Sequence, residues 1–154
     1  MVIITYSIIL KDILSNSIIL LSYIVCNVTL SIANCSASSK EEDCEKAFDE
    51  SDHWLSTSTG HVEWIKLNLD HGYYITDLQL RQDGSYKARS VMVVFSDGTE
   101  VNSTLEQKAD EWLNVELPTG IVSRYINITT LRENRTHDHM SVKQVRVGGC
   151  QPGT

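Results

Sequence analysis

The sequence has little proline and little positive charge, and both shortages restrict what the protein can be. Only 2 prolines occur in 154 residues, and after Lys40 there is no repeat, low-complexity tract or linker, which indicates one compact domain. Lysine and arginine number 13 against 20 aspartates and glutamates, so the formal charge is −7. This acidic balance argues against nucleic acid and against anionic phospholipid as the main partner.

The common catalytic motifs are missing as well. The sequence contains no GxSxG, no HExxH, no phosphate-binding loop and no cysteine beside a plausible base. The carboxylates Asp49 and Asp52 are close in sequence, but a crowded acidic loop needs no catalytic purpose. We therefore expect a protein that is not an enzyme.

The N-terminal residues have almost no charge, with only Lys11 and Asp12 before Lys40. The apolar stretch at 17–32 has the length of a signal-peptide core, and the small residues that follow it offer cleavage sites as far as residue 37. These features predict a signal peptide over 1–37, a globular domain over 38–154 and a secreted, extracellular protein. The alternative is a signal anchor that keeps 17–33 in a membrane. Either reading places residues 1–33 outside the fold.

Four cysteines are present, and their positions suit an exported protein. Cys44 stands at the start of the globular part and Cys150 near its end, which predicts a disulfide between Cys44 and Cys150. Cys26 would leave with the signal peptide. Cys35 would be lost, left free, or available to pair with a second chain in an oligomer.

The sequence also contains acceptor sites for N-linked glycans after the predicted signal peptide. Asn102, Asn127 and Asn134 each begin an Asn-x-Ser/Thr triplet. In alternating strands, burial of Val101 and Leu105 turns Asn102 to solvent, and burial of the isoleucines beside Asn127 turns Asn127 outward. We expect glycosylation at these three positions.

Apolar and polar residues alternate in seven segments, which predicts seven strands. Turn residues separate them, and the Asp-Gly pair at Asp97 predicts a type I′ hairpin in which Asp97 turns the chain rather than doing chemistry. The only helical candidate is 44–50. The fold class is therefore all-β, an antiparallel β-sandwich or jelly roll. The predicted strands are 62–69, 73–81, 90–96, 99–105, 112–117, 123–131 and 142–147.

The order of several segments resembles that of discoidin domains, the C-type domains of the clotting cofactors, in the galactose-binding-like superfamily. The resemblance covers about 107 residues, and the segments that carry it are AFDESDHWLS, WIKLNLDHGYYITDLQLR, SVMVVFSDGTEV, SRYINITT and VRVGGC. It implies an eight-stranded jelly roll that binds sugars, lipids or proteins through loops at one end. It also implies termini joined by a disulfide.

The resemblance directs attention to the loops at 50–61, 82–88 and 133–140. Arg81 and Arg89 bracket a loop with Tyr86 at its middle, and they are similar in position to an arginine pair of the fucose-binding lectins of this superfamily. The matching histidine is either His53 or His61. The cysteine pair of those lectins is absent, which argues against fucose itself. A plainer interpretation is that Arg81 and Arg89 form surface ion pairs with Asp83 or Asp77.

Metal ligands can also be considered. The resemblance implies a calcium ion near Asp49, although the last strand offers Gln144 where a carboxylate would be expected. His137 and His139 form a pair without a third ligand in view, which favours a solvated loop. Calcium is thus a candidate cofactor, and Asp49 is its predicted ligand.

Together these observations predict a secreted recognition module for a glycan or glycoprotein surface. The candidate carbohydrate-binding residues are His53, Arg81, Tyr86 and Arg89. The alternative is an extracellular protein-contact or structural domain without a sugar site.

Overall fold

A computed structural model describes residues 26, 28–57, 62–83, 88–106, 108, 110–131 and 140–152. Almost all of its regular structure is antiparallel β, which confirms the predicted fold class. In chain order the elements are β1 (Val28–Thr29), β2 (Ile32–Ala37), the 3-10 helix η1 (Glu41–Ala47), β3 (Trp54–Leu55), β4 (Trp64–Arg81), β5 (Ser90–Phe95), β6 (Glu100–Thr104), β7 (Trp112–Asn114), β8 (Val122–Thr130), β9 (Ser141–Val142) and β10 (Gln144–Cys150).

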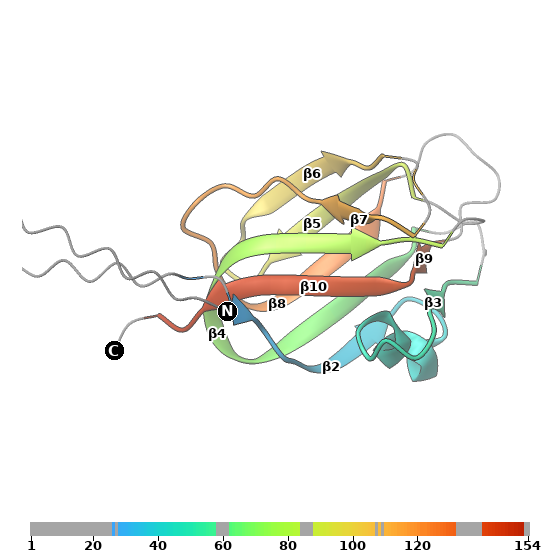
Figure 1. Ribbon diagram of the computed structural model, residues 1–154, viewed down its shortest axis with the longest axis horizontal. Coiled ribbons are helices and arrows are strands. Elements are labelled where there is room, and N and C mark those ends of the chain that lie inside the picture. The colour runs from blue at the N-terminus through green and yellow to red at the C-terminus, as the bar shows by residue number, and fades with distance from the viewer. Residues whose placement is uncertain are drawn as a thin grey trace, which may run out of the picture.

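Strand β4 joins the two layers of the sandwich because it belongs to both. Its first part pairs with β2 and β8, and its second part pairs with β10 and β7 (Figure 1). Beyond β8 the first layer continues through β5 to β6, while β1 lies beside β10 in the second. The strands predicted at 62–69 and 73–81 are therefore one strand, bent near Gly72 where its register with β8 shifts.

The core lies between the layers and follows from the alternation of the sequence. Ile65, Leu67 and Leu69 of β4 are buried, whereas Lys66 and Asn68 between them are half-buried on the outer face. Burial of such side chains supplies the main driving force for folding. Other fully buried side chains are Trp54, Leu78, Val91, Val93, Phe95, Ile126 and Ile128.

The disulfides differ from the prediction. Cys26 is bonded to Cys150, and Cys35 is bonded to Cys44. The predicted Cys44–Cys150 pair is wrong because β1 runs antiparallel to β10, with Val28 opposite Gly149, so that Cys26 is the cysteine beside Cys150. Cys35 is therefore not available to link two chains.

The N-terminal boundary also differs. β1 and β2 belong to the sheet, so residues 28–37 are part of the fold and the predicted boundary at residue 37 cuts through it. Cleavage after residue 33 or 37 would remove β1, and the apolar segment 17–33 overlaps β1 and the start of β2. Residues 1–25 lie outside the described residues. Within the described part of the chain, no helix is long and apolar enough to span a membrane.

A close approach explains the second glycine of VRVGGC. A Cβ atom on Gly149 would lie 2.2 Å from the carbonyl oxygen of Tyr74. Any side chain here would push β10 away from β4. The glycine thus lets the end of β10 lie flat against β4, with Cys150 opposite Tyr74 and bonded to Cys26.

Asp97 shapes the turn between β5 and β6, as the sequence predicts, although not in a type I′ turn. Gly98 has φ 88°, but Asp97 is not among the residues with positive φ, whereas a type I′ turn needs positive φ at both central positions. The Asp97 carboxylate accepts hydrogen bonds from the Thr99 amide at 2.9 Å and the Val122 amide at 3.0 Å. It therefore ties the hairpin to the start of β8.

We expect Asp97→Ala to lower the free energy of unfolding by about 1 kcal/mol at neutral pH, because both amides lose an ionised acceptor. Burial raises the pKa of Asp97, but the hydrogen bonds from Thr99 and Val122 outweigh it and hold this pKa below its ordinary value. The contribution is therefore present above about pH 4 and is lost as the pH falls through the pKa of the folded protein.

Urea unfolding of the two proteins at neutral and acidic pH measures this difference. Glu100→Ala, at an exposed position of the same hairpin, is the matched control and should change stability by less than about 0.5 kcal/mol. An Asp97→Ala loss that stays constant down to about pH 3 would contradict the assigned role of the carboxylate.

Candidate functional site

The end of the sandwich at which β4 terminates also carries β3 and β9 (Figure 1). β3 pairs with β9, and Ser56 and Met140 extend this pairing through two hydrogen bonds of 2.9 and 2.8 Å. Trp54 is fully buried and its indole Nε1 donates to the Ser39 carbonyl at 3.0 Å. This anchor fixes the loop that precedes β3, so that His53 is held at the rim of the sandwich.

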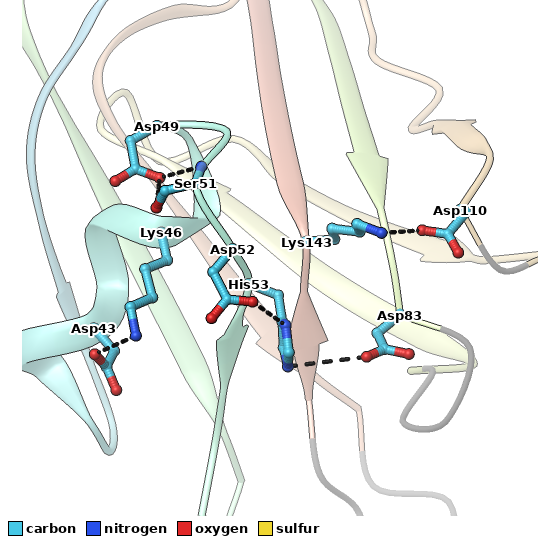
Figure 2. A network of polar contacts seen from close by, with 9 residues as sticks. All are labelled: Asp43, Lys46, Asp49, Ser51, Asp52, His53, Asp83, Asp110 and Lys143. Atoms are coloured by element: carbon cyan, nitrogen blue, oxygen red, sulfur yellow. Dashed lines mark hydrogen bonds and ion pairs between the residues drawn. The ribbon is translucent and has the colours of Figure 1, made fainter.

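His53 lies between two carboxylates from different loops (Figure 2). Its Nδ1 is 2.9 Å from Asp52 Oδ1, and its Nε2 is 3.9 Å from Asp83 Oδ2. The His53 side chain is 30% exposed and the Asp83 side chain 35%. The arrangement places a ring with two nitrogens and two carboxylates at the rim, where they can donate to and accept from the hydroxyls of a ligand.

Arg81 forms a second polar group at the same end with Asp110 and Lys143. Its Nε donates to the Asp110 carbonyl at 3.0 Å, and its guanidinium is 3.9 Å from the Asp110 carboxylate. The Lys143 ammonium also donates to this carboxylate (Figure 2). The hydrogen bond from Lys143 lowers the pKa of Asp110 and outweighs the opposing effect of desolvation. Asp110 is therefore the anion at the centre of the group.

The sequence did not indicate Asp110 as the partner of Arg81. The plainer interpretation paired Arg81 with Asp83 or Asp77, which are near in sequence. Asp110 is 29 residues from Arg81 and reaches it because the Asp110 amide donates to the Gln82 carbonyl at 3.0 Å. Its φ of 58° is a left-handed conformation, which aspartate tolerates better than most residues. No local motif in the sequence marks this contact.

The loop that Arg81 and Arg89 bracket is closed by a buried side chain. Gln82 is 2% exposed, its Oε1 accepts from the Ala88 amide at 2.7 Å, and its Nε2 donates to the Ala88 carbonyl at 3.3 Å. These two hydrogen bonds hold Gln82 and Ala88 together at the base of the loop. Arg81 and the exposed Arg89 therefore stand on either side of this base.

Several predicted residues are not placed by the structure. Tyr86, His61 and Asn134 lie outside the described residues, as do His137 and His139. Of the two predicted histidines, His53 lies among the described residues, at the rim.

The Asp49 carboxylate, the predicted calcium ligand, is engaged by a neighbouring serine. The Asp49 carboxylate is exposed and accepts from the amide and hydroxyl of Ser51, at 2.9 and 2.6 Å (Figure 2). These two hydrogen bonds lower the pKa of Asp49. Gln144 is buried, pairs with Arg81 of β4, and lines a pocket together with Phe48 and Glu50, the neighbours of Asp49. Among the described residues, no three histidine, cysteine, aspartate or glutamate side chains are grouped as metal ligands.

The bent β4, the two-layer sandwich and the polar rim define a discoidin-type β-sandwich domain. The F5/8 type C domain model matches residues 31–144, so the chain belongs to the F5/8 type C domain family. This membership confirms the resemblance found in the sequence. No curated protein sequence matches the chain.

Solved structures with the same fold include modules attached to carbohydrate-active enzymes. The chain is 18% identical to a truncated AlyQ with CBM32 and alginate lyase domains, at a TM-score of 0.66, and the match covers 83% of this chain but only 35% of that one. The family 32 CBM of Clostridium perfringens NanJ, solved with galactose, is 16% identical at a TM-score of 0.64, with 79% and 99% of the two chains covered. A chitosan-binding module from a Paenibacillus sp. IK-5 chitosanase/glucanase is 20% identical at a TM-score of 0.59, with 80% and 98% covered.

Proposed function

We propose that the protein is a secreted, non-enzymatic recognition module that binds a carbohydrate through the rim containing His53, Arg81 and Arg89. The observation that carries this proposal is the position of His53, held between Asp52 and Asp83 beside the end of β4. Family membership and structural neighbours that bind galactose or chitosan support it.

The chemistry of the rim suits a neutral sugar. A sugar hydroxyl both donates and accepts hydrogen bonds, and its recognition requires donors and acceptors that are held in place before binding. His53 and Asp83 supply both kinds of group, and Arg81 at the end of β4 supplies a rigid set of donors. The buried Gln82 and Trp54 hold the segments from which these side chains project.

Export is part of the proposal. Two disulfides among the described residues suit an oxidising compartment. A leader that ends before Cys26 would leave both disulfides and both N-terminal strands intact. We therefore place the boundary of the mature domain before residue 26.

One observation favours a second candidate function, an extracellular protein-contact domain without a sugar site. His53, Arg81 and Lys143 each have a carboxylate partner within 4 Å. Exposed ion pairs of this kind are common on protein surfaces and contribute little to stability. The rim could thus be a solvated polar surface.

Binding of the secreted protein to a glycan array distinguishes the carbohydrate-binding function from the protein-contact function. We expect Arg81→Ala, His53→Ala and Arg89→Ala each to weaken binding at least about tenfold, which corresponds to loss of roughly 1.4 kcal/mol of binding free energy. Arg124→Ala is the matched control, since Arg124 is an exposed arginine on β8. An array without hits, or rim variants that bind like the control, would favour the protein-contact function.

A further inference from the structure

A cleft of about 540 Å³ lies along one side of the sandwich, between the edge strands of the two layers. Among the described residues β6 pairs only with β5, and β7 pairs only with β4. Each therefore has one side without a neighbouring strand, and residues of both strands line the cleft. Figure 1 shows β6 and β7 along the same side of the molecule. The volume is in the range of known ligand pockets.

The lining includes a complete acceptor site for an N-linked glycan. Asn102, Ser103 and Thr104 all line the cleft, and Asn102 is exposed. Trp112 and Asn114 of β7 line the same cleft. We propose that Asn102 carries an N-linked glycan whose first sugar residues occupy this cleft and cover the open edges of β6 and β7.

The chemistry of the cleft suits a neutral oligosaccharide. Glu106, Glu111 and Glu116 contribute carboxylates. Among the described lining residues Lys108 is the one basic side chain, and it lies 2.6 Å from Glu106 and 3.5 Å from Glu111. Carboxylates accept hydrogen bonds from sugar hydroxyls, and the net negative charge disfavours an anionic chain. The core sugars of an N-linked glycan carry no charge.

The position also gives the glycan a physical role. Unpaired strand edges are templates for association with other chains, and proteins usually cover or interrupt them. A bulky hydrophilic group between β6 and β7 would block both edges at once. Asn127 offers no such position, because β8 lies between β4 and β5 and the Asn127 Oδ1 atom is buried without a hydrogen-bond partner.

The proposal depends on entry into the secretory pathway and not on the sugar site at the rim. Its test begins with the full chain expressed in secreting eukaryotic cells and with mass spectrometry of the peptide that contains Asn102. Hydrogen exchange is then compared between wild type and Asn102→Gln, in the peptide covering 111–117. Because β7 pairs with β4 and not with β6, the substitution itself should not disturb its hydrogen bonds, and we expect its amides to exchange at least several-fold more slowly in the glycosylated wild type.

Further variants separate the glycan from the substitution. Thr104→Ala should reproduce the faster exchange while keeping Asn102, and Thr104→Ser, which retains the acceptor site, should behave like wild type. Tyr74→Asn in the Asn102→Gln background creates an acceptor site at a position that is 41% exposed on β4, and its glycan should leave β7 unprotected. An unmodified Asn102, or β7 exchange that is the same with and without the Asn102 glycan, would overturn the proposal.

Discussion

Replacing Cys26 and Cys150 together by serine is expected to lower the free energy of unfolding by about 5 kcal/mol, because this disulfide joins residues separated by 124 positions and restricts the unfolded chain strongly. Small domains have a total stability of roughly 5–15 kcal/mol. The loss is therefore a large part of the stability of the domain. It should be accompanied by release of the N-terminal strand β1 from β10.

The matched control is the double substitution Cys35→Ser with Cys44→Ser. This disulfide spans only 9 positions, so its removal is expected to cost about 2.7 kcal/mol in the same entropic model. Urea unfolding of both double variants measures the difference, and intact mass with peptide mapping verifies the pairing in the wild type. A Cys44–Cys150 linkage in the map, or a larger loss for the control, would contradict the structure.

The second large effect is expected for Glu63→Ala, which should lower the free energy of unfolding by about 3 kcal/mol. Glu63 is 1% exposed, and its Oε2 accepts hydrogen bonds from the hydroxyls of Ser38 and Ser39. Removing the carboxylate takes the acceptor away from the exposed Ser38 hydroxyl and the half-buried Ser39 hydroxyl. It also empties the space that the buried Glu63 side chain fills, and both effects destabilise the fold.

These hydroxyls also connect Glu63 to the functional end of the sandwich. The Ser38 hydroxyl accepts from the Trp64 amide and the Ser39 hydroxyl accepts from the Thr57 amide, both at 3.0 Å. The Ser39 carbonyl accepts from the Trp54 indole, beside His53. Loss of Glu63 should therefore weaken the support of the rim as well as the global stability.

Urea unfolding with an unchanged m value would show that the Glu63→Ala loss is one of stability. Glu116→Ala is the control at an exposed position and should stay within about 0.5 kcal/mol of wild type. Glu63→Gln keeps an acceptor oxygen and should lose less than Glu63→Ala. A Glu63→Ala protein as stable as the Glu116→Ala protein would rule out the buried network as a source of stability.

Much of the fold could be predicted from the sequence because strand periodicity is a local property. Alternation predicted a strand over 62–69, whose residues Ile65 and Leu67 are buried, and the ordered set of segments identified the family. The turn at Asp97 was predicted correctly in position but not in type, since the conformation of Asp97 depends on its hydrogen bond to Val122 in another strand. Local signals therefore predict that a turn exists better than they predict its geometry.

The disulfides show where local reasoning failed. The apolar run before residue 33 was interpreted as a signal peptide, which removed Cys26 and β1 from consideration. The described end of this run forms strands β1 and β2, and the pairing of β1 with β10 brings Cys26 beside Cys150. The same pairing decides which cysteine reaches Cys150.

The sequence by itself determined the all-β class, the alternation that divides core from surface, and the family, because these depend on residue types at regular spacing. Only the tertiary structure decided that Asp110 lies against Arg81, that Asp83 lies near His53 and that Asn102 lines a cleft shared with β7. Each of these contacts joins residues separated by about 10 to 30 positions through strand pairing or loop closure. No pattern within one segment contains that information.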